Sequence, residues 1–344
     1  MGVVMNRITS FLLWGLAGAV AFGAVALMGT PVRAEVKEVR LAKQFGVSYL
    51  PLIVMEQHGL IEKKARAAGL GDVKTTWARF SSGAVMNDAL LSDNVDFASG
   101  GVGPLVKIWA ATKGRLNVKG VSAINSMPLF LNTNNPKVKS LRDFTENDRI
   151  ALPAVKVSIQ AVTLQMGVEQ VFGAGHYDKL DHLTVSMKHP DGMAALISGT
   201  EITAHFTSPP FMFQELENPK VHTVTTSFDI LGGPATFNVV WATERFRKSN
   251  PRTYAAVYAA LEEAMDIIAK DKRAAAALYV KSTKSKLAVD SVARMISDPS
   301  VHYTTTPLNT MKYANFMRKV GAIKVKPDNW QELFFDNVRN LKGS

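Results

Sequence analysis

The stretch NVDFASGGVGPLVKIWAAT, residues 94–112, decides the fold class. Residues 95–98 predict a short buried strand, and residues 102–112 have the pattern of a helix. A glycine-rich turn that includes Gly100, Gly101 and Gly103 joins the two. A strand that passes through a tight turn into a helix is the unit from which parallel sheets are built.

This unit repeats on both sides of the stretch. Further strands are predicted at 36–41, 72–77 and 116–123, and helices at 52–68 and 82–91. A second series follows, with strands at 129–131, 149–152, 183–187, 202–206 and 221–225 and helical segments at 141–143, 159–172, 192–197 and 210–216. The alternation predicts an α/β protein whose sheets are mainly parallel and covered by helices.

The last part of the chain differs, because it is almost wholly helical after a final strand at 236–242. Pro251 opens a helix that Ser249 or Asn250 caps. One face of that helix is apolar and consists of Tyr254, Tyr258, Leu261, Met265 and Ile268. Further helices are predicted at 274–279, 288–296, 310–320 and 330–340.

So long a helical tail needs a surface to cover, and we expect it to pack on the first lobe. Residues 35–125 and 233–344 then form lobe 1, and residues 126–232 form an inserted lobe 2. The chain would cross between them near Asn125 and near Gly232-Gly233, which makes a double-crossing hinge. Ligands of open α/β sheets bind at the carboxyl ends of the strands, so we expect a binding cleft between the lobes.

The first 34 residues predict export. Arg7 gives a positive start, residues 11–28 carry no charge, and Val32 and Ala34 have the modest size that a signal peptidase requires. We expect cleavage after Ala34; the alternative is that residues 11–28 remain as a membrane anchor, at the lower limit of the length that spans a bilayer. Cleavage leaves 310 of the 344 residues and removes two basic residues, Arg7 and Arg33, which lowers the net charge from +11 to +9.

Composition limits the function further. The chain has no Cys, which excludes disulfides, a zinc–thiolate site, an iron–sulfur cluster and a Cys nucleophile. The seven His are scattered without metal-ligand spacing, so we expect no metal and no cofactor. The Lys and Arg residues are also scattered, and an exported chain of this kind predicts no nucleic-acid partner; the positive charge favours an acidic small molecule.

Several short segments, taken in order, resemble one family of binding proteins. They are 44–51 (QFGVSYLP), 59–63 (GLIEK), 80–83 (FSSG), 94–98 (NVDFA), 140–143 (SLRD), 150–153 (IALP) and 193–199 (MAALISG). Together they are similar to the nitrate/sulfonate/taurine (SsuA/THI5-like) class of periplasmic substrate-binding proteins, over roughly residues 36–340. The resemblance implies the type II periplasmic-binding-protein fold, with two α/β lobes, and solute capture without chemistry.

The resemblance also implies a place in the cell and partners. The chain would be the monomeric, periplasmic component of an ABC importer. It would capture a small anionic solute, such as nitrate, a sulfonate or taurine, and deliver it to a permease in the inner membrane.

Candidate ligand-binding residues of lobe 1 lie in loops after its predicted strands. Phe45, Gly46 and Tyr49 would line the cleft, or else form an ordinary tight turn; Ser81, Ser82 and Gly83 open a helix, where hydroxyl and N–H groups either cap the helix or bind an anion. Arg79 would pair with an anion or remain solvated. Gly101 would let the backbone approach a ligand, and the turn is no dinucleotide fingerprint because the third glycine position is Val106.

Candidate residues of lobe 2 come from two loops. Lys156 would supply charge, and Ser158 would cap the helix that starts beside it. In the loop after the strand at 202–206, Phe206 would form a wall of the pocket and Ser208 would cap the next helix. His205 is either a ligand-binding group or a satisfied, partly buried histidine.

Two other function classes stay open on the same fold. One is a ligand sensor that docks on a membrane receptor, and the other is a heterocycle-processing enzyme. The enzyme is disfavoured because the sequence has no Gly-x-Ser-x-Gly, no His-Glu-x-x-His and no P-loop. We therefore expect no catalytic residues.

Overall fold

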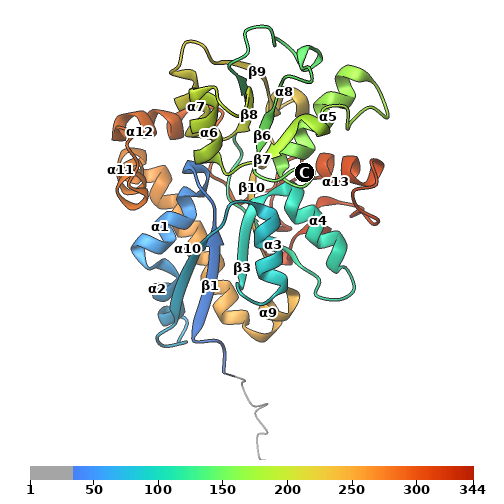
Figure 1. The fold of residues 1–344 in the computed structure, drawn as a ribbon. Coiled ribbons are helices and arrows are strands. Elements are labelled where there is room, and N and C mark those ends of the chain that lie inside the picture. The colour runs from blue at the N-terminus through green and yellow to red at the C-terminus, as the bar shows by residue number, and fades with distance from the viewer. Residues whose placement is uncertain (1–33) are drawn as a thin grey trace, which may run out of the picture. The chain divides into compact units, whose positions relative to one another are not determined.

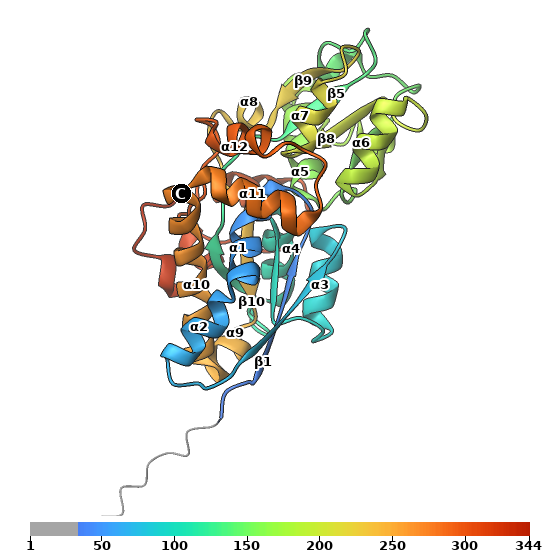
Figure 2. The ribbon, with the colours of Figure 1, turned by 90° about the vertical axis from the view of Figure 1, so that its left-hand side faces the viewer.

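The computed structural model describes residues 34–344, which form two α/β lobes, each built around one five-stranded sheet (Figures 1 and 2). The first sheet has the strand order β2-β1-β3-β10-β4. Its strands are β1 (Glu38–Lys43), β2 (Lys74–Arg79), β3 (Phe97–Gly101), β4 (Lys119–Ala123) and β10 (Asn238–Ala242). The second sheet has the order β7-β6-β8-β5-β9. Its strands are β5 (Phe130–Thr133), β6 (Ile150–Leu152), β7 (Thr184–Ser186), β8 (Ala204–Thr207) and β9 (His222–Thr226).

Each sheet holds one strand that runs against the others. β10 lies between β3 and β4 and is antiparallel to both, while β5 lies between β8 and β9 and is antiparallel to both. These two strands directly follow the crossings between the lobes. A chain that arrives from the other lobe enters at the cleft edge of the sheet, so its strand must run away from the cleft. The prediction of mainly parallel sheets is confirmed for the remaining four strands of each sheet.

Helices cover the faces of both sheets (Figures 1 and 2). They are α1 (Leu50–His58), α2 (Leu60–Ala67), α3 (Gly83–Leu91), α4 (Val102–Thr112), α5 (Ile159–Phe172), α6 (His189–Ser198), α7 (Phe211–Leu216), α8 (Ser227–Leu231), α9 (Glu244–Ser249), α10 (Pro251–Lys270), α11 (Lys272–Thr283), α12 (Val289–Ser297) and α13 (Thr310–Lys319). Short 3₁₀ turns lie at Val47–Tyr49, Leu141–Asp143, Asp181–Leu183, Trp330–Leu333 and Asp336–Val338.

Two helix predictions were wrong. The helix expected at 52–68 is two helices, because Gly59 adopts a left-handed φ of 59° between α1 and α2. The helix expected at 330–340 is a pair of 3₁₀ turns with extended backbone at Phe334. Phe334 and Phe335 are adjacent, yet both are buried. This is possible because an extended backbone directs neighbouring side chains to opposite faces.

The helix that starts at Pro251 supports the first lobe. Its residues Tyr254, Leu261 and Ile268 are buried, and α10 packs on α1 and α2. Tyr258, predicted for the same face, is half-buried. This packing confirms that the amphipathic face predicted from the sequence belongs to the first lobe's core.

The two crossing segments are tied to each other by buried amides. The Asn125 side-chain carbonyl accepts the Asn238 backbone N–H at 3.2 Å, and the Asn125 Nδ2 donates to the Ser48 carbonyl at 2.6 Å. A third segment lies alongside, because Ser126 and His302 exchange two backbone hydrogen bonds of 2.8 Å. The hinge therefore contains the two predicted crossings and one additional stretch of chain.

That additional stretch leads into α13, which contacts both lobes. α13 packs on α4 of the first lobe and on α5 of the second. Its Tyr313 hydroxyl lies 3.1 Å from the Thr163 hydroxyl, and its Lys319 ammonium lies 2.6 Å from the Glu169 carboxylate, both on α5. In Figure 1 α13 lies at one side of the hinge and α11 at the other.

The predicted signal segment lies outside the described residues, apart from Ala34. Within residues 34–344, no helix combines the length and the apolar character that crossing a membrane requires. The exact lobe boundaries, 35–125 with 233–344 and 126–232, stay a prediction.

Gly120 of β4 provides a test of the packing described above. A Cβ atom at this position would overlap the ring of buried Phe334. Gly120→Ala should lower the free energy of unfolding by about 1–3 kcal/mol, as overpacking does. Urea denaturation measures the change. In the double variant with Phe334→Leu, the loss should be smaller than the sum of the two single losses; additive losses would show that the ring contact is not the cause.

Candidate functional site

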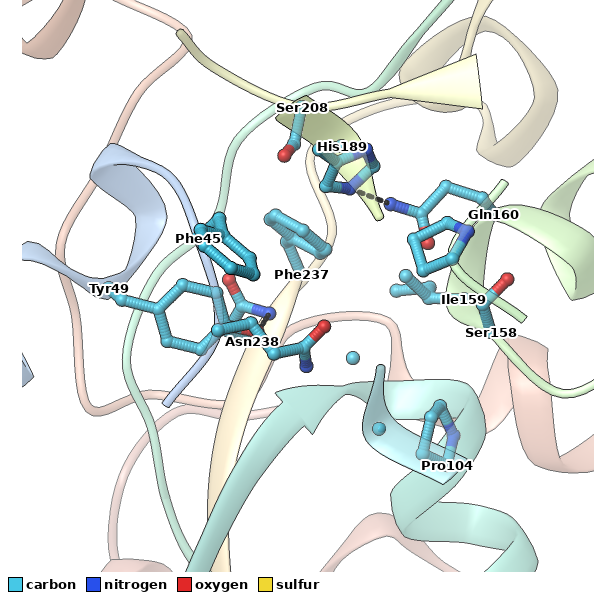
Figure 3. A pocket seen from close by; sticks show the side chains of 14 residues that line it. Phe45, Tyr49, Pro104, Ser158, Ile159, Gln160, His189, Ser208, Phe237 and Asn238 are labelled. Atoms are coloured by element: carbon cyan, nitrogen blue, oxygen red, sulfur yellow. Dashed lines mark hydrogen bonds between the residues drawn. The ribbon is translucent and has the colours of Figure 1, made fainter. Parts of the chain in front are cut away.

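A small cavity, here called the inner cavity, lies between the two lobes (Figure 3). Strand ends of both sheets supply part of its wall, as the fold predicts. Its lining consists of Gln44, Phe45, Tyr49, Gly83, Gly101, Pro104, Pro153, Ser158, Ile159, Gln160, His189, Ser208, Phe237 and Asn238.

The sheet topology explains which residues reach the inner cavity. Gln44 follows β1, Pro153 follows β6 and Ser208 follows β8, so each lies just beyond the carboxyl end of its strand. Asn238 instead begins β10, because the antiparallel strand starts at the cleft edge. The crossing segment thereby adds Phe237 and Asn238 to the wall.

Four helices begin at the inner cavity: α3, α4, α5 and α6, whose first residue is His189. The hydroxyls of Ser82 and Ser158 cap two of them by accepting the amides of Val85 and Ala161, at 3.4 and 3.2 Å. The other first-turn amides have no acceptor within their own helix, and the helix dipole adds partial positive charge there. The inner cavity therefore has positive potential from backbone groups.

The side chains around the inner cavity are polar or apolar but carry no fixed charge: among the described residues that line it there is no Asp, Glu, Lys or Arg. Asn238 Nδ2 donates to the Tyr49 hydroxyl at 3.0 Å, and burial raises the pKa of Tyr49, so its phenol stays neutral. The Ser208 hydroxyl is fully buried and has no hydrogen-bond partner within residues 34–344. A buried hydroxyl of this kind is suited to bind a polar ligand atom.

A chain of buried polar side chains extends from the inner cavity into the second lobe. Gln160 Nε2 lies 3.2 Å from His189 Nε2, the contact drawn in Figure 3. His189 Nδ1 lies 3.1 Å from His205 Nε2, and His205 Nδ1 lies 2.6 Å from a Glu215 carboxylate oxygen. Burial, with the neighbouring His205 as a second cause, lowers the pKa of His189 well below its usual value, so this lining imidazole is neutral.

A second and larger space, here called the outer pocket, shares Gln44 and Phe45 with the inner cavity. Its remaining lining is Gly46, Ile53, Arg79, Pro190, Pro210, Phe211, Gln214, Tyr279, Thr283 and Ser285. The Arg79 guanidinium lies over the Phe45 ring at 5.3 Å from its centroid. Phe45 thus stands where the two spaces meet.

The lobes touch directly beside these spaces. The Val47 amide donates to the Pro209 carbonyl at 3.3 Å. A Cβ atom on Gly101 would lie 2.6 Å from Ile159 Cβ, and one on Gly46 would lie 2.7 Å from the Pro209 carbonyl oxygen. Glycine at positions 46 and 101 allows this close approach.

Most of the predicted binding residues lie at one of the two spaces. The inner cavity contains Phe45, Tyr49, Gly83, Gly101, Ser158 and Ser208. The outer pocket contains Gly46 and Arg79 in addition to Phe45.

Five of the predicted residues line neither space. Ser81 and Lys156 are exposed, whereas Ser82 is buried as a helix cap. His205 and Phe206 are fully buried, because β8 is a central strand covered on both faces. His205 does not line the inner cavity but contacts His189, which does.

Sequence reasoning missed several lining residues, above all His189, Gln160, Phe237 and Asn238. The helix that carries His189 was predicted to begin at Gly192, although Pro190 in the first turn was an available signal for an earlier start. Phe237 and Asn238 were assigned to a strand, and only the antiparallel direction of that strand places its beginning at the cleft.

Comparison with known families gives a match over most of the chain. The model of the NMT1-like family matches residues 33–281. No curated protein sequence matches the chain.

Solved structures share the fold. The alkanesulfonate-binding protein SsuA from Xanthomonas axonopodis pv. citri, bound to MOPS, has a TM-score of 0.65 and 18% identity, covering 84% of this chain and 92% of its own. The periplasmic aliphatic sulphonate binding protein SsuA from Escherichia coli has a TM-score of 0.64 and 18% identity, covering 90% and 95%. The periplasmic nitrate-binding protein NrtA from Synechocystis PCC 6803 has a TM-score of 0.64 and 13% identity, covering 87% and 84%. The predicted periplasmic-binding-protein fold is thereby confirmed, and the family match and the neighbours are consistent with the predicted class.

The buried imidazole of His189 makes stability depend on pH. Its pKa is lowered in the folded chain from an ordinary value of 6.5, so below that pH the unfolded chain binds the proton more readily. Stability should therefore fall as the pH drops below about 6.5, with a contribution from His189 of up to ~1.4 kcal/mol per pH unit.

Urea denaturation of wild type and His189→Gln between about pH 5 and 8 measures this contribution. The variant should lose less stability on acidification than wild type. The exposed His182, bonded to Glu146 at 2.8 Å, gives a matched control, His182→Gln. Equal acid sensitivity of His189→Gln and wild type would contradict the assignment.

Proposed function

We propose, from the premise that the chain belongs to the NMT1-like family, that it is a solute-binding protein that captures a small organic anion between its lobes without chemistry. The observation that carries the proposal is the inner cavity, where four helix N-termini and several polar groups from both lobes converge. The structural neighbours are binding proteins of transporters, which supports a binding role.

The anionic character of the solute is supported by backbone electrostatics. First-turn amides and helix dipoles stabilise an anion, and α3, α4 and α5 all direct this end at the same space. The Ser208 hydroxyl and the Asn238 amide add donors from the two sides. The net charge, which is +9 after the predicted cleavage, would also draw an anion toward the protein.

The organic part of the solute is supported by the rest of the wall. Phe45, Pro104 and Phe237 give the inner cavity apolar surfaces, which a bare inorganic anion would leave in poor contact. Beyond Phe45 the outer pocket offers further room, together with the Arg79 guanidinium. An anionic head group in the inner cavity and a short carbon chain or ring directed toward Phe45 fit this arrangement.

The proposed location is the periplasm, and the proposed partner is a membrane permease. Periplasmic neighbours and the predicted signal segment support a periplasmic protein that delivers its solute to an ABC permease of the inner membrane. A monomer suffices for this role, because both walls of the cavity come from one chain. Conversion of a bound solute would instead indicate an enzyme, and binding without an associated permease would indicate a sensor.

A ligand screen tests the proposal. Calorimetry of the mature chain with nitrate, taurine, ethanesulfonate and the neutral ethanesulfonamide separates charge from shape. We expect ethanesulfonate to bind at least about tenfold more tightly than the sulfonamide, which is ~1.4 kcal/mol. Tighter binding of the sulfonamide than of every anion would overturn the anion assignment.

Gly101→Ala tests binding between the lobes. The added Cβ would lie 2.6 Å from Ile159 Cβ on the opposite lobe, so the lobes could not approach as closely. Affinity for ethanesulfonate should fall by at least about tenfold, because the contacts from one lobe would be lost. The double variant Gly101→Ala, Ile159→Gly removes the clash and should recover part of the affinity. Unchanged affinity in Gly101→Ala would show that the ligand binds elsewhere.

A further inference from the structure

The chain of buried groups behind the inner cavity has a definite direction. Gln160, His189, His205 and Glu215 are all at least nine-tenths buried, so their hydrogen bonds are shielded from water. The second Glu215 oxygen accepts an amide N–H from Asn132 at 2.9 Å, which holds the carboxylate in place. The chain begins at the cavity wall and ends at a fixed acceptor.

One arrangement of protons satisfies every contact. Gln160 donates to His189 Nε2, His189 Nδ1–H donates to His205 Nε2, and His205 Nδ1–H donates to Glu215. The Thr207 hydroxyl, 3.2 Å from His189 Nδ1, accepts in the same arrangement. All donors then point toward Glu215. Two ring nitrogens carry no proton: His205 Nε2, which accepts from His189, and His189 Nε2, which lies on the cavity side.

We propose that His189 recognises the charge of the ligand by taking up one proton at Nε2 when the anion binds, while His205 and Glu215 hold the resulting imidazolium in place. This rests on the proposed function. The amide of Gln160 gives way to the anion, the proton comes from solvent, and the new N–H donates to an oxygen of the ligand. No covalent bond in the ligand forms or breaks.

The surroundings of His189 make it the suitable group. Of the described residues that line the inner cavity, only Tyr49 and His189 titrate, and the Tyr49 phenol stays neutral. From the second lobe, His205 and Glu215 face His189, and the Phe211 ring stacks on it at 5.7 Å. At its own helix start, Lys188 and Asp191 pair with each other at 3.3 Å. Arg79 lies beyond Phe45 in the outer pocket.

Proton uptake has a defined sign. Burial keeps the pKa of His189 low, and an anion beside Nε2 raises it, so the complex binds more protons than the separate partners. Affinity should therefore rise as the pH falls through the pKa of the complex, by up to about tenfold per pH unit. At higher pH the affinity should no longer change, because His189 stays neutral in both states.

Calorimetry of ethanesulfonate binding in cationic buffers that differ in ionisation enthalpy measures the uptake directly. We expect the number of protons taken up per ligand to approach one as the pH is lowered toward about 5, with the affinity rising in parallel. Binding without proton uptake at any pH between about 5 and 8 would overturn this proposal and leave the proposed function intact. Failure of every tested anion to bind would contradict the proposed function itself.

Variants separate the roles of the residues. His189→Gln should bind with an affinity independent of pH, and Glu215→Gln should move the rise in affinity to lower pH, because the imidazolium loses its counter-charge. The exposed His182→Gln should behave as wild type. If a variant does not fold, ¹⁵N spectra of wild-type His189 serve instead: an imidazolium signal on adding ethanesulfonate supports the proposal, and an unchanged neutral ring overturns it.

Discussion

The arrangement of the cleft depends on one constraint, which is that the chain changes lobes at the edge where the sheets bind ligand. A strand that starts at this edge must run away from it, so β5 and β10 are antiparallel and lie between parallel strands. The hinge and the wall of the inner cavity therefore share part of the chain. Asn238 shows this most clearly, because it pairs with Asn125 in the hinge, bonds the Tyr49 hydroxyl and lines the inner cavity.

A cavity lined without charged side chains avoids the desolvation cost of a buried charge. A buried Lys or Arg beside the cavity would cost desolvation energy whenever no anion compensated it. Helix N-termini avoid this cost, since their charge is partial and their amides are part of the backbone. A neutral imidazole that is protonated beside an anion gains a full positive charge only when the negative charge of the anion compensates it. The low pKa of His189 and its hydrogen-bonded support by His205 and Glu215 agree with this division of roles.

Local sequence signals predicted the parts of the fold that local forces determine. α4 and α5 have the predicted bounds, and Ser82 and Ser158 are caps, because glycine turns and hydroxyl caps act within a few residues. The lining at Phe237 and Asn238 could not be found in this way, since it depends on the direction of a strand set by a distant crossing. The charge of Lys156 predicts a role in binding, yet Lys156 is exposed and the described lining of the inner cavity contains no charged side chain.

The third segment at the hinge ties the two lobes together on one side. Two crossings alone would let the lobes twist as well as bend. Ser126 forms backbone hydrogen bonds with His302, and Tyr313 and Lys319 of α13 contact α5. One side of the hinge is therefore held by contacts to both lobes. Residues of α11 and α7 line the outer pocket, and α11 lies on the opposite side of the molecule from α13 (Figure 1). A solute that reached the inner cavity through the outer pocket would pass Arg79 and Phe45.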